Sequence, residues 1–382
     1  MPPPERVCSP LILSRLILQK LFPLLAFLSV HLLSAQVDTS VLADGPYLMY
    51  DDNDRLTAYW TDPEARTSSQ AVWAEDVVSQ LPAFRTFRPE LVNKDTVFHR
   101  SQQVTFTGVD KLAIVSDIHG QYEVIRKLLI SHGIMDERRH WTFGESHFVI
   151  VGDIFDRGGQ VTEILWMIHN LQQEALAAGG RVHFLLGNHE TMIMDGDIRY
   201  INKRYLTTGA LLQIPYQELY GPDSYLGRWL RSLPLTVQIN DMVFVHGGFS
   251  TEMVRKICEL GKINDLYHQH LIDNVYGTVA GETEELQLMK GRQGPLWYRG
   301  YFTDRDLDDK DLAKILKKLK AGRMVVGHTS FEAIRSFFDG KVIAVDSSMK
   351  FGSMGEVLLV EDGHFVRGNL LGERVDLFEA GR

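Results

Sequence analysis

From Lys111 onward the chain repeats short, uninterrupted apolar runs. Seven of them stand out: LAIVS, HFVIVG, VHFLLG, MVFVHG, RMVVG, KVIAVD and EVLLVE. Continuous runs rich in β-branched residues are typical of strands that are buried on both faces. Several runs are followed by apolar residues at helical spacing. The pattern therefore predicts a layered α/β architecture, with a β-sheet core flanked by helices.

Two helices are predicted within this region. Over 161–178 the apolar residues recur at near-helical spacing, and Gly179 with Gly180 supplies a stop. The stripe consists of Ile164, Leu165, Ile168, Leu171 and Leu176. A second stripe consists of Leu312, Ile315, Leu316 and Leu319. The stretches 191–232 and 251–300 are rich in Tyr, Arg and Gly, and we expect irregular insertions there, over one end of the sheets.

The segment before Lys111 has a different rhythm. PYLMY and RLTAYW flank the turn sequence DDND, which indicates a β-hairpin, and VTFTG forms a further short run. We therefore expect a small antiparallel β segment over residues 36–109, packed on a main domain over residues 110–382.

The first 35 residues are typical of an export signal. Three basic residues precede the nearly uncharged run Leu21–Leu33, which ends in LLSAQ. A basic start, a short apolar stretch and small residues at its end predict a signal peptide cleaved after Ala35. The run is short for a membrane span, which needs about 20 residues, although an uncleaved anchor is the alternative. The expected location is secreted or periplasmic.

Composition agrees with a globular body. The chain has 382 residues, is 45% hydrophobic and 23% charged, and carries a net charge of −9. Loss of residues 1–35 removes a net charge of +2 and leaves −11. An acidic mature chain argues against nucleic acid or an anionic membrane as a partner. Cys258 is then the only cysteine, so an intrachain disulfide is excluded.

Five of the apolar runs end in residues that can bind metal ions. They are Asp117 and His119, Asp153 and Asp156, Asn188 and His189, His246, and His328. Ligands of open α/β sheets bind beyond the carboxyl ends of the strands, so we expect these side chains to converge. Singly, each has a structural explanation, such as a helix cap for Asp153. A purely structural explanation must account for all five polar interruptions at once.

The donor types indicate which metals fit. Imidazole, carboxylate and amide oxygen, without thiolate, suit divalent first-row ions of intermediate hardness. Two ions about 3.5–4 Å apart, with a shared carboxylate, use such a set. Two such ions outweigh two carboxylates and attract an anion such as phosphate. Arg157 directly follows Asp156, and the geometry of its guanidinium matches that of phosphate oxygens. The alternative is that Arg157 is only a surface charge.

At these residues the sequence resembles the calcineurin-like metallophosphoesterases, in particular the phosphoprotein-phosphatase branch. That branch carries the blocks GDxHG, GDxxDRG, GNHE, HGG and GHT, and this chain has SDIHG, GDIFDRG, GNHE, HGG and GHT in the same order. The resemblance spans roughly residues 110–365. GPLWYRG at 294–300 and the VDSS that ends at Ser348 are similar to the bacterial Shewanella-like phosphatases. The resemblance implies a metallophosphoesterase fold for the main, catalytic domain.

The resemblance also implies a role for each matched residue. The first metal would be bound by Asp117 and His119, the second by Asn188, His246 and His328, and Asp153 would bridge the two. Arg157 would bind phosphate and His189, oriented by Asp156, would act as the general acid. Arg299 is the candidate for a second phosphate-binding arginine, and a salt-bridged loop residue is its alternative. The expected ions are manganese, with iron or zinc as alternatives.

The implied reaction is direct hydrolysis of a phosphomonoester by metal-bound hydroxide. The expected substrates are phosphoserine, phosphothreonine or phosphotyrosine in proteins. A phosphatase of small esters, or a nucleotide pyrophosphatase similar to diadenosine tetraphosphatases, is the alternative, because chemistry at the metals is nearly the same. A binding module without activity is a third reading. Two departures matter: position 330 is Ser where many related enzymes carry a further His, and SSMKFGS replaces the Tyr-bearing loop of the eukaryotic enzymes.

Overall fold

The computed structural model of the protein describes residues 43–62, 66–73, 81–93, 97–273, 283–303 and 307–378. The chain divides into two compact units, Met1–Ser40 and Val41–Arg382, of which the second is described. The apolar run Leu21–Leu33 lies outside the described residues, so the signal peptide stays a prediction. Of the helices that the structure describes, none has both the length and the apolar character that a membrane span requires.

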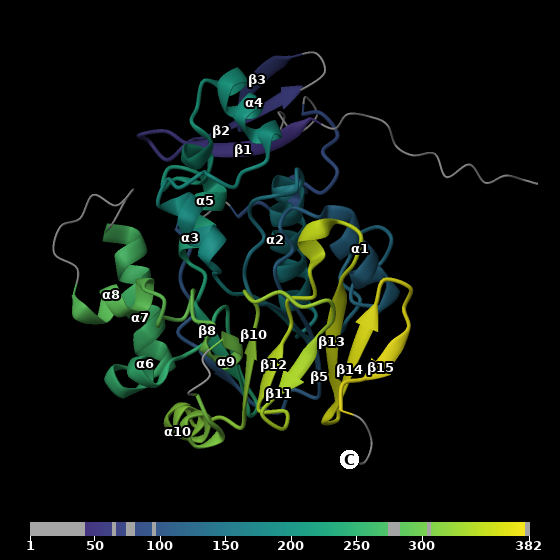
Figure 1. Ribbon diagram of the computed structural model, residues 1–382. Coiled ribbons are helices and arrows are strands. Elements are labelled where there is room, and N and C mark those ends of the chain that lie inside the picture. The colour runs from purple at the N-terminus through teal and green to yellow at the C-terminus, as the bar shows by residue number, and fades with distance from the viewer. Residues whose placement is uncertain are drawn as a thin grey trace, which may run out of the picture. The chain divides into compact units, whose positions relative to one another are not determined.

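Two six-stranded sheets form the centre of the larger unit (Figure 1). The first has the order β15-β14-β13-β5-β6-β7 and the second β11-β12-β10-β9-β8-β4. The strands of the first are β5 (Lys111–Val115), β6 (His147–Ile150), β7 (Arg181–Phe184), β13 (Glu356–Glu361), β14 (His364–Asn369) and β15 (Arg374–Asp376). Those of the second are β4 (Thr105–Phe106), β8 (Thr236–Ile239), β9 (Met242–Val245), β10 (Arg323–Val326), β11 (Arg335–Phe337) and β12 (Val342–Ala344). Each of the seven predicted runs overlaps one of these strands.

Parallel pairing brings the important strand ends together. Strands β5, β6 and β7 run parallel, with Ile114 opposite Val149 and Val149 opposite His183. Strands β9, β10 and β12 are likewise parallel in the second sheet. The carboxyl ends of each parallel set therefore lie at one edge of their sheet, where the predicted ligands follow the strands.

The two sheets pack face to face through alternate residues of their strands. On β5, Leu112 and Ile114 share one apolar cluster with Phe244 of β9 and Val325 of β10. The residues between them, such as Ala113, belong to a second cluster that contains the helices. Both faces of the strands are therefore covered, which explains their continuous apolar runs and confirms the predicted fold class.

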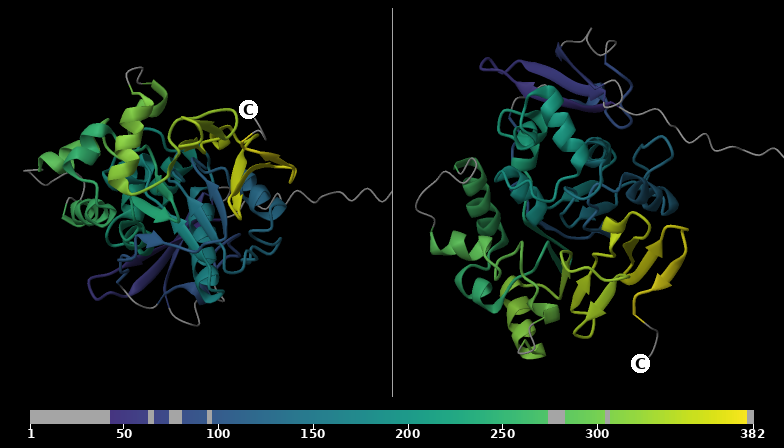
Figure 2. Two further views of the ribbon diagram at one scale, coloured as in Figure 1. Left: turned by 90° about the horizontal axis from the view of Figure 1, so that it is seen from below. Right: turned by 45° about the horizontal axis from the view of Figure 1, so that its top comes forward.

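Helices cover the outer faces of both sheets. On the first sheet these are α1 (Tyr122–Ser131) and α2 (Val161–Ala177). The second sheet packs against α7 (Leu260–Asp273) at β8, and α10 (Asp309–Leu319) joins the same apolar cluster and contacts α6 (Thr251–Lys256). The predicted stripe of α10 is buried throughout. Figure 2 shows the green helices and the yellow strands on different sides of the central strands.

Helix α2 differs from the prediction in one residue. Gly179, with a φ of +83°, supplies the expected stop. Leu176 is 55% exposed, so its place in the apolar stripe is wrong, and Ala175 is buried instead. The helix is buried on every side over 161–171 and only its last turn reaches solvent, so spacing alone selected the wrong residue there.

The N-terminal antiparallel sheet has the order β1-β2-β3, and the predicted hairpin forms its first two strands. Its strands are β1 (Asp44–Tyr50), β2 (Leu56–Asp62) and β3 (Thr67–Val72), and a short 3₁₀ helix, η2 (Pro89–Leu91), follows. This purple sheet lies over α4 and α5 (Figure 1). The run VTFTG does not join it, because β4 pairs parallel with β8. The domain boundary near residue 109 stays a prediction.

Where the structure describes them, the two stretches that were expected to be irregular are largely helical. Residues 191–232 contain the end of α3 (Asn188–Met194), followed by α4 (Lys203–Leu212), η3 (Tyr216–Tyr220) and α5 (Tyr225–Arg231). Residues 251–300 contain α6, α7, α8 (Glu284–Lys290) and the start of α9 (Gly300–Thr303), and η5 (Met349–Phe351) lies further on. Side chains of Asn202, Ser224, Ser250 and Thr283 accept backbone N–H bonds at the starts of α4, α5, α6 and α8. These cap residues were the sequence signal that the prediction of irregular structure overlooked.

Candidate metal centre

The candidate metal ligands meet at the carboxyl ends of the parallel strands. Two groups of side chains offer ligand atoms that lie within 4.8 Å of one another, and Asp153 belongs to both. The groups are His119, Asp153 and His189, and Asp153, His246 and His328. The remaining two candidates adjoin them, with Asp117 Oδ1 3.9 Å from His119 Nε2 and Asn188 Oδ1 3.0 Å from His246 Nε2. Five strand ends therefore meet around one carboxylate.

The backbone at these strand ends is strained. Asp117, His119, Asp153 and His328 adopt left-handed conformations, with φ of 52°, 48°, 60° and 63°. Each such residue raises the energy by about 1 kcal/mol or more, so the surrounding structure must hold it in place. Close approach adds a further constraint, because a Cβ on Gly187 would stand 2.2 Å from Asp153 Oδ1. Strain of this kind gathers at functional sites.

Hydrogen bonds orient the imidazoles toward the centre. The Nδ1–H of His119 donates to Phe155 O (2.7 Å), and that of His246 donates to Val151 O (2.7 Å). Each ring therefore presents Nε2 to the centre, as metal-binding histidines commonly do. The buried Nε2 of His328 has no hydrogen-bond partner in the structure. The Nε2 atoms of His119 and His328, together with the carboxylates, fit divalent cations.

The electrostatics of the centre are those of a cation site. Burial lowers the pKa of His119 to about 3 and that of His328 to about 2, so both are neutral and can bind a metal. Burial opposes ionisation of Asp153, but the neighbouring imidazoles outweigh it and hold the pKa of this carboxyl well below its usual value. Burial also opposes the charge of His246, yet Asp153 and Asp117 raise its pKa to about 10.

His189 is paired with Asp156 through its Nδ1. Its Nε2 lies 3.8 Å from Asp153 Oδ2, and the Nε2 of His119 lies at the same distance from that oxygen. Burial lowers the pKa of His189, but Asp153 and Asp156 together raise it above its usual value. The ring is therefore able to carry a proton near neutral pH, as the predicted general acid requires.

The two candidate phosphate-binding arginines line one cavity above the centre. This cavity of about 180 Å³ is lined by Asp117, His119, Asp153, Arg157, Asn188, His189, Tyr200, Trp297, Arg299, His328, Ser330 and Lys350. Arg157 is exposed, and its guanidinium carbon lies 5.7 Å from the ring centre of Tyr200. Arg299 donates to His328 O (2.6 Å) and to Thr329 Oγ1 (3.1 Å). These bonds hold Arg299 beside a candidate metal ligand.

Sequence reasoning missed Glu190, which anchors the loop that carries Asp153. Its carboxylate is fully buried and accepts four backbone N–H bonds, from Gly187 (2.7 Å), Asp153 (2.8 Å), Ile154 (2.7 Å) and Phe155 (3.3 Å). Glu190 is the third residue of α3 after its cap, Gly187. The available signal was therefore a Glu three positions after the start of a helix.

A second group that the sequence did not reveal lies on the other side of the cavity. Ser330 donates to Asp346 (2.5 Å), and Lys350 donates to Ser330 (2.5 Å). Asp346 is fully buried and adjoins Asp117, whose pKa is raised first by burial and then by this second carboxylate. The hydroxyl at position 330 therefore links a lysine to the carboxylates, where many related enzymes carry an imidazole.

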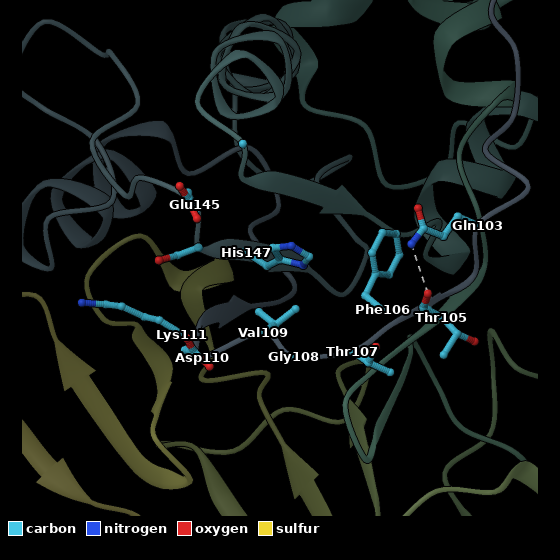
Figure 3. Close-up of a pocket in the computed structure, with 12 residues that line it drawn as sticks. Gln103, Thr105, Phe106, Thr107, Gly108, Val109, Asp110, Lys111, Glu145 and His147 are labelled. Carbon is cyan, nitrogen blue, oxygen red and sulfur yellow. Dashed lines mark hydrogen bonds between the residues drawn. The ribbon is translucent and has the colours of Figure 1, made fainter.

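A larger cavity, of about 420 Å³, lies at the amino ends of β5 and β6 (Figure 3). Lys111, Glu145 and His147 line it, and the ring of His147 faces Phe106. His147 also pairs with His183 (3.0 Å). Because this cavity is at the opposite ends of the strands from the candidate ligands, its size does not make it the catalytic pocket.

Comparison with known proteins agrees with the geometry. The family model described as "Calcineurin-like phosphoesterase" matches residues 111–330. Shewanella-like protein phosphatase 2 of Arabidopsis thaliana is 27% identical over 323 residues, which cover 69% of this chain and 78% of that protein. Shewanella-like protein phosphatase 1 of Plasmodium berghei is 26% identical over 262 residues, which cover 66% of this chain and 70% of that protein. The crystal structure of the cold-active protein-tyrosine phosphatase of a psychrophilic Shewanella species is 37% identical, with a TM-score of 0.77, and covers 88% of this chain and 99% of that one.

Proposed function

The chain belongs to the calcineurin-like phosphoesterase family and is a metallophosphatase, and we propose that it uses two divalent metal ions to hydrolyse phosphomonoesters on protein side chains. One observation carries the proposal. Asp153 Oδ2 lies 3.8 Å from His119 Nε2 and 3.3 Å from His246 Nε2, which are candidate ligands of different ions, and two arginines line the cavity directly above. A shared carboxylate suits two adjacent cations, and paired guanidinium groups suit a phosphoryl group.

The family uses divalent metals, and the proposed ions are manganese, with iron or zinc as alternatives. Asp117 and His119 are proposed to hold one ion, Asn188, His246 and His328 the other, and Asp153 both. When bound, such a pair lowers the pKa of a water from 15.7 toward about 7 and so supplies a nucleophile at neutral pH. The donor set supports this, because it contains imidazole and oxygen donors but no thiolate.

The remaining residues are assigned to the phosphoryl and leaving groups. Arg157 and Arg299 bind the nonbridging phosphoryl oxygens and stabilise the charge that develops on them. His189 donates its proton to the leaving oxygen, which departs poorly as an alkoxide. Asp156 accepts from Nδ1 of the His189 ring, so it fixes the ring orientation and keeps the proton on the ring.

Two features support a protein substrate, and phosphotyrosine in particular. The relatives named above are called protein phosphatases, and the one with 37% identity is called a protein-tyrosine phosphatase. The cavity also carries two aromatic walls. The Tyr200 ring lies 5.6 Å from that of His189, and the Trp297 ring 5.6 Å from that of His328. An aromatic leaving group can stack between such rings.

A substrate panel tests this proposal. The manganese-loaded protein is assayed side by side on phosphotyrosine peptides, phosphoserine peptides and dinucleoside tetraphosphates, and kcat/KM is compared. We expect peptides to be preferred, with phosphotyrosine first. A preference for the nucleotides would overturn the protein substrate in favour of a pyrophosphatase. Stoichiometric metal without turnover of any ester would instead leave a metal-binding module.

Export is proposed from the sequence of residues 1–35 alone. In the native host, mass spectrometry of the mature protein should find a chain that begins near Gln36. A membrane-bound chain that retains these residues would favour the anchor.

A further inference from the structure

The N-terminal sheet lies outside the residues that match the family, yet a buried polar chain connects it to the loop that carries Arg157. This series of polar contacts starts at Asp44 of β1, which is fully buried. Its carboxylate accepts from Tyr47 (3.1 Å) and Thr208 (2.5 Å) and lies 3.4 Å from Nη2 of Arg204. The contact with Arg204 is a buried ion pair without a hydrogen bond, and loss of either side chain would leave the other charge buried without this partner.

The Arg204 guanidinium also binds the loop that carries Arg157. Its Nη1 donates to Gly159 O (2.7 Å) and to Oε1 of Glu163 (3.1 Å). Glu163 stands in the first turn of α2, so one planar group joins β1, the start of α2 and the segment that follows Arg157. The five donors of a guanidinium in fixed directions suit this bridging task, which a flexible ammonium performs poorly.

Asn202 holds the other side of the same loop. Its side-chain oxygen accepts from the backbone N–H of Arg204 (3.0 Å), and its amide donates to Arg157 O (2.8 Å). The backbone N–H of Arg157 in turn donates to Tyr200 O (3.1 Å). Arg157 has a φ of +64°, a conformation that a non-glycine residue keeps only when its surroundings hold it.

We propose that Asp44, Arg204 and Asn202 form a brace that holds the strained backbone of Arg157, so that the N-terminal sheet positions the phosphate-binding side chain. These are positioning residues, since none of them lines the cavity above the metal centre. The inference rests on the proposed phosphate-binding role of Arg157. Loss of a buried partner that orients a binding group commonly lowers activity 10–100-fold, and we expect roughly 10-fold here.

A double-mutant cycle tests the brace in the full chain with manganese. Asp44→Asn and Asn202→Ala are each made alone and together with Arg157→Ala. The readouts are the inhibition constant of inorganic phosphate, kcat/KM on a nitrophenyl ester, bound metal and the melting temperature. Asp51→Asn is the matched control, because Asp51 pairs with Arg55 at the exposed tip of the same sheet.

If the brace is real, Asp44→Asn and Asn202→Ala each weaken phosphate inhibition and lower kcat/KM roughly 10-fold while both metals remain. The same changes have little further effect once Arg157 is Ala, and the control changes nothing. An equal fold-loss with and without the Arg157 side chain would overturn the brace and indicate a general effect on folding. Asn202 is only half-buried, so its variant decides the matter if Asp44→Asn does not fold. Unchanged phosphate inhibition in Arg157→Ala alone would instead overturn the proposed role of that arginine.

Discussion

Glu190→Gln is the most direct perturbation of the loop that carries Asp153. In the structure, one carboxylate oxygen accepts from Gly187 and Asp153, and the other accepts from Ile154 and Phe155. A glutamine keeps one of these oxygens. Its NH₂ group replaces the other and points a donor at two backbone donors, so two hydrogen bonds are lost and two buried N–H groups lose their partners.

The size of the effect follows from these contacts. Hydrogen bonds to a charged group contribute about 1.5–3 kcal/mol each, so two of them amount to about 3–6 kcal/mol. Part of this loss is offset, because burial and the charge of Asp153 already raise the pKa of Glu190, and a neutral amide removes both penalties. We expect the free energy of unfolding to fall by about 2–4 kcal/mol. The melting temperature should drop by roughly 3–6 °C in a unit of this size.

The assay is urea unfolding followed by tryptophan fluorescence, in a chelator so that lost metal affinity does not add to the result. Glu123→Gln is the control, because Glu123 forms an exposed ion pair with Arg85 and should change stability by less than about 0.5 kcal/mol. In the presence of manganese, Glu190→Gln should also bind less metal, since it disturbs Asp153. A variant that unfolds within about 1 kcal/mol of the parent and keeps both metals would refute the anchoring role of Glu190.

Three further predictions concern the centre and the core. Asp153→Asn should nearly abolish turnover and reduce bound metal, measured by elemental analysis, and full activity with two metals retained would remove Asp153 from the bridge. His189→Asn should keep both metals and lose roughly 10²–10⁴-fold of its activity on phosphoserine peptides, but clearly less on an activated nitrophenyl ester. Asp156→Asn should show the same ranking of the two esters with smaller losses. Equal losses on both esters, or a lost metal, would contradict the general acid. Burial lowers the pKa of His169 to about 4. Below pH ~6.5 the unfolded chain therefore takes up a proton that the folded chain does not. As the pH falls from there to about 4, the free energy of unfolding decreases by up to about 1.4 kcal/mol per pH unit. His169→Gln should therefore flatten the dependence of urea-unfolding free energy on pH in this window, and an unchanged slope would show that other groups govern it.

Local sequence patterns were enough to predict the strands and the residues at their ends. A strand that is covered on both faces must be apolar throughout, so Asp117 or His246 directly after such a run is conspicuous without any knowledge of the fold. Parallel strands bring their carboxyl ends to one edge, which makes convergence predictable as well. The stop of α2 at Gly179 was predictable for a similar local reason, because glycine readily adopts a positive φ.

Tertiary structure decided what depends on partners far apart in the chain. Leu176 has the spacing of a core residue but lies on the turn of α2 that leaves the core, so its exposure depends on what surrounds the helix. The two overlooked helical stretches are held by capping side chains and packing rather than by a strong apolar period. β4 pairs with β8 although more than 120 residues separate them, a choice that no local pattern encodes.

The same reason applies to the residues that support the centre. Glu190 is adjacent to the candidate ligands in sequence, but three of its four bonds come from a loop more than 30 residues earlier. Asp44 and Arg204 are separated by 160 positions and meet only because the N-terminal sheet lies over α4. A motif specifies which atoms can bind metal or phosphate. Buried hydrogen bonds between distant segments determine how those atoms are held, and those contacts exist only in the folded chain.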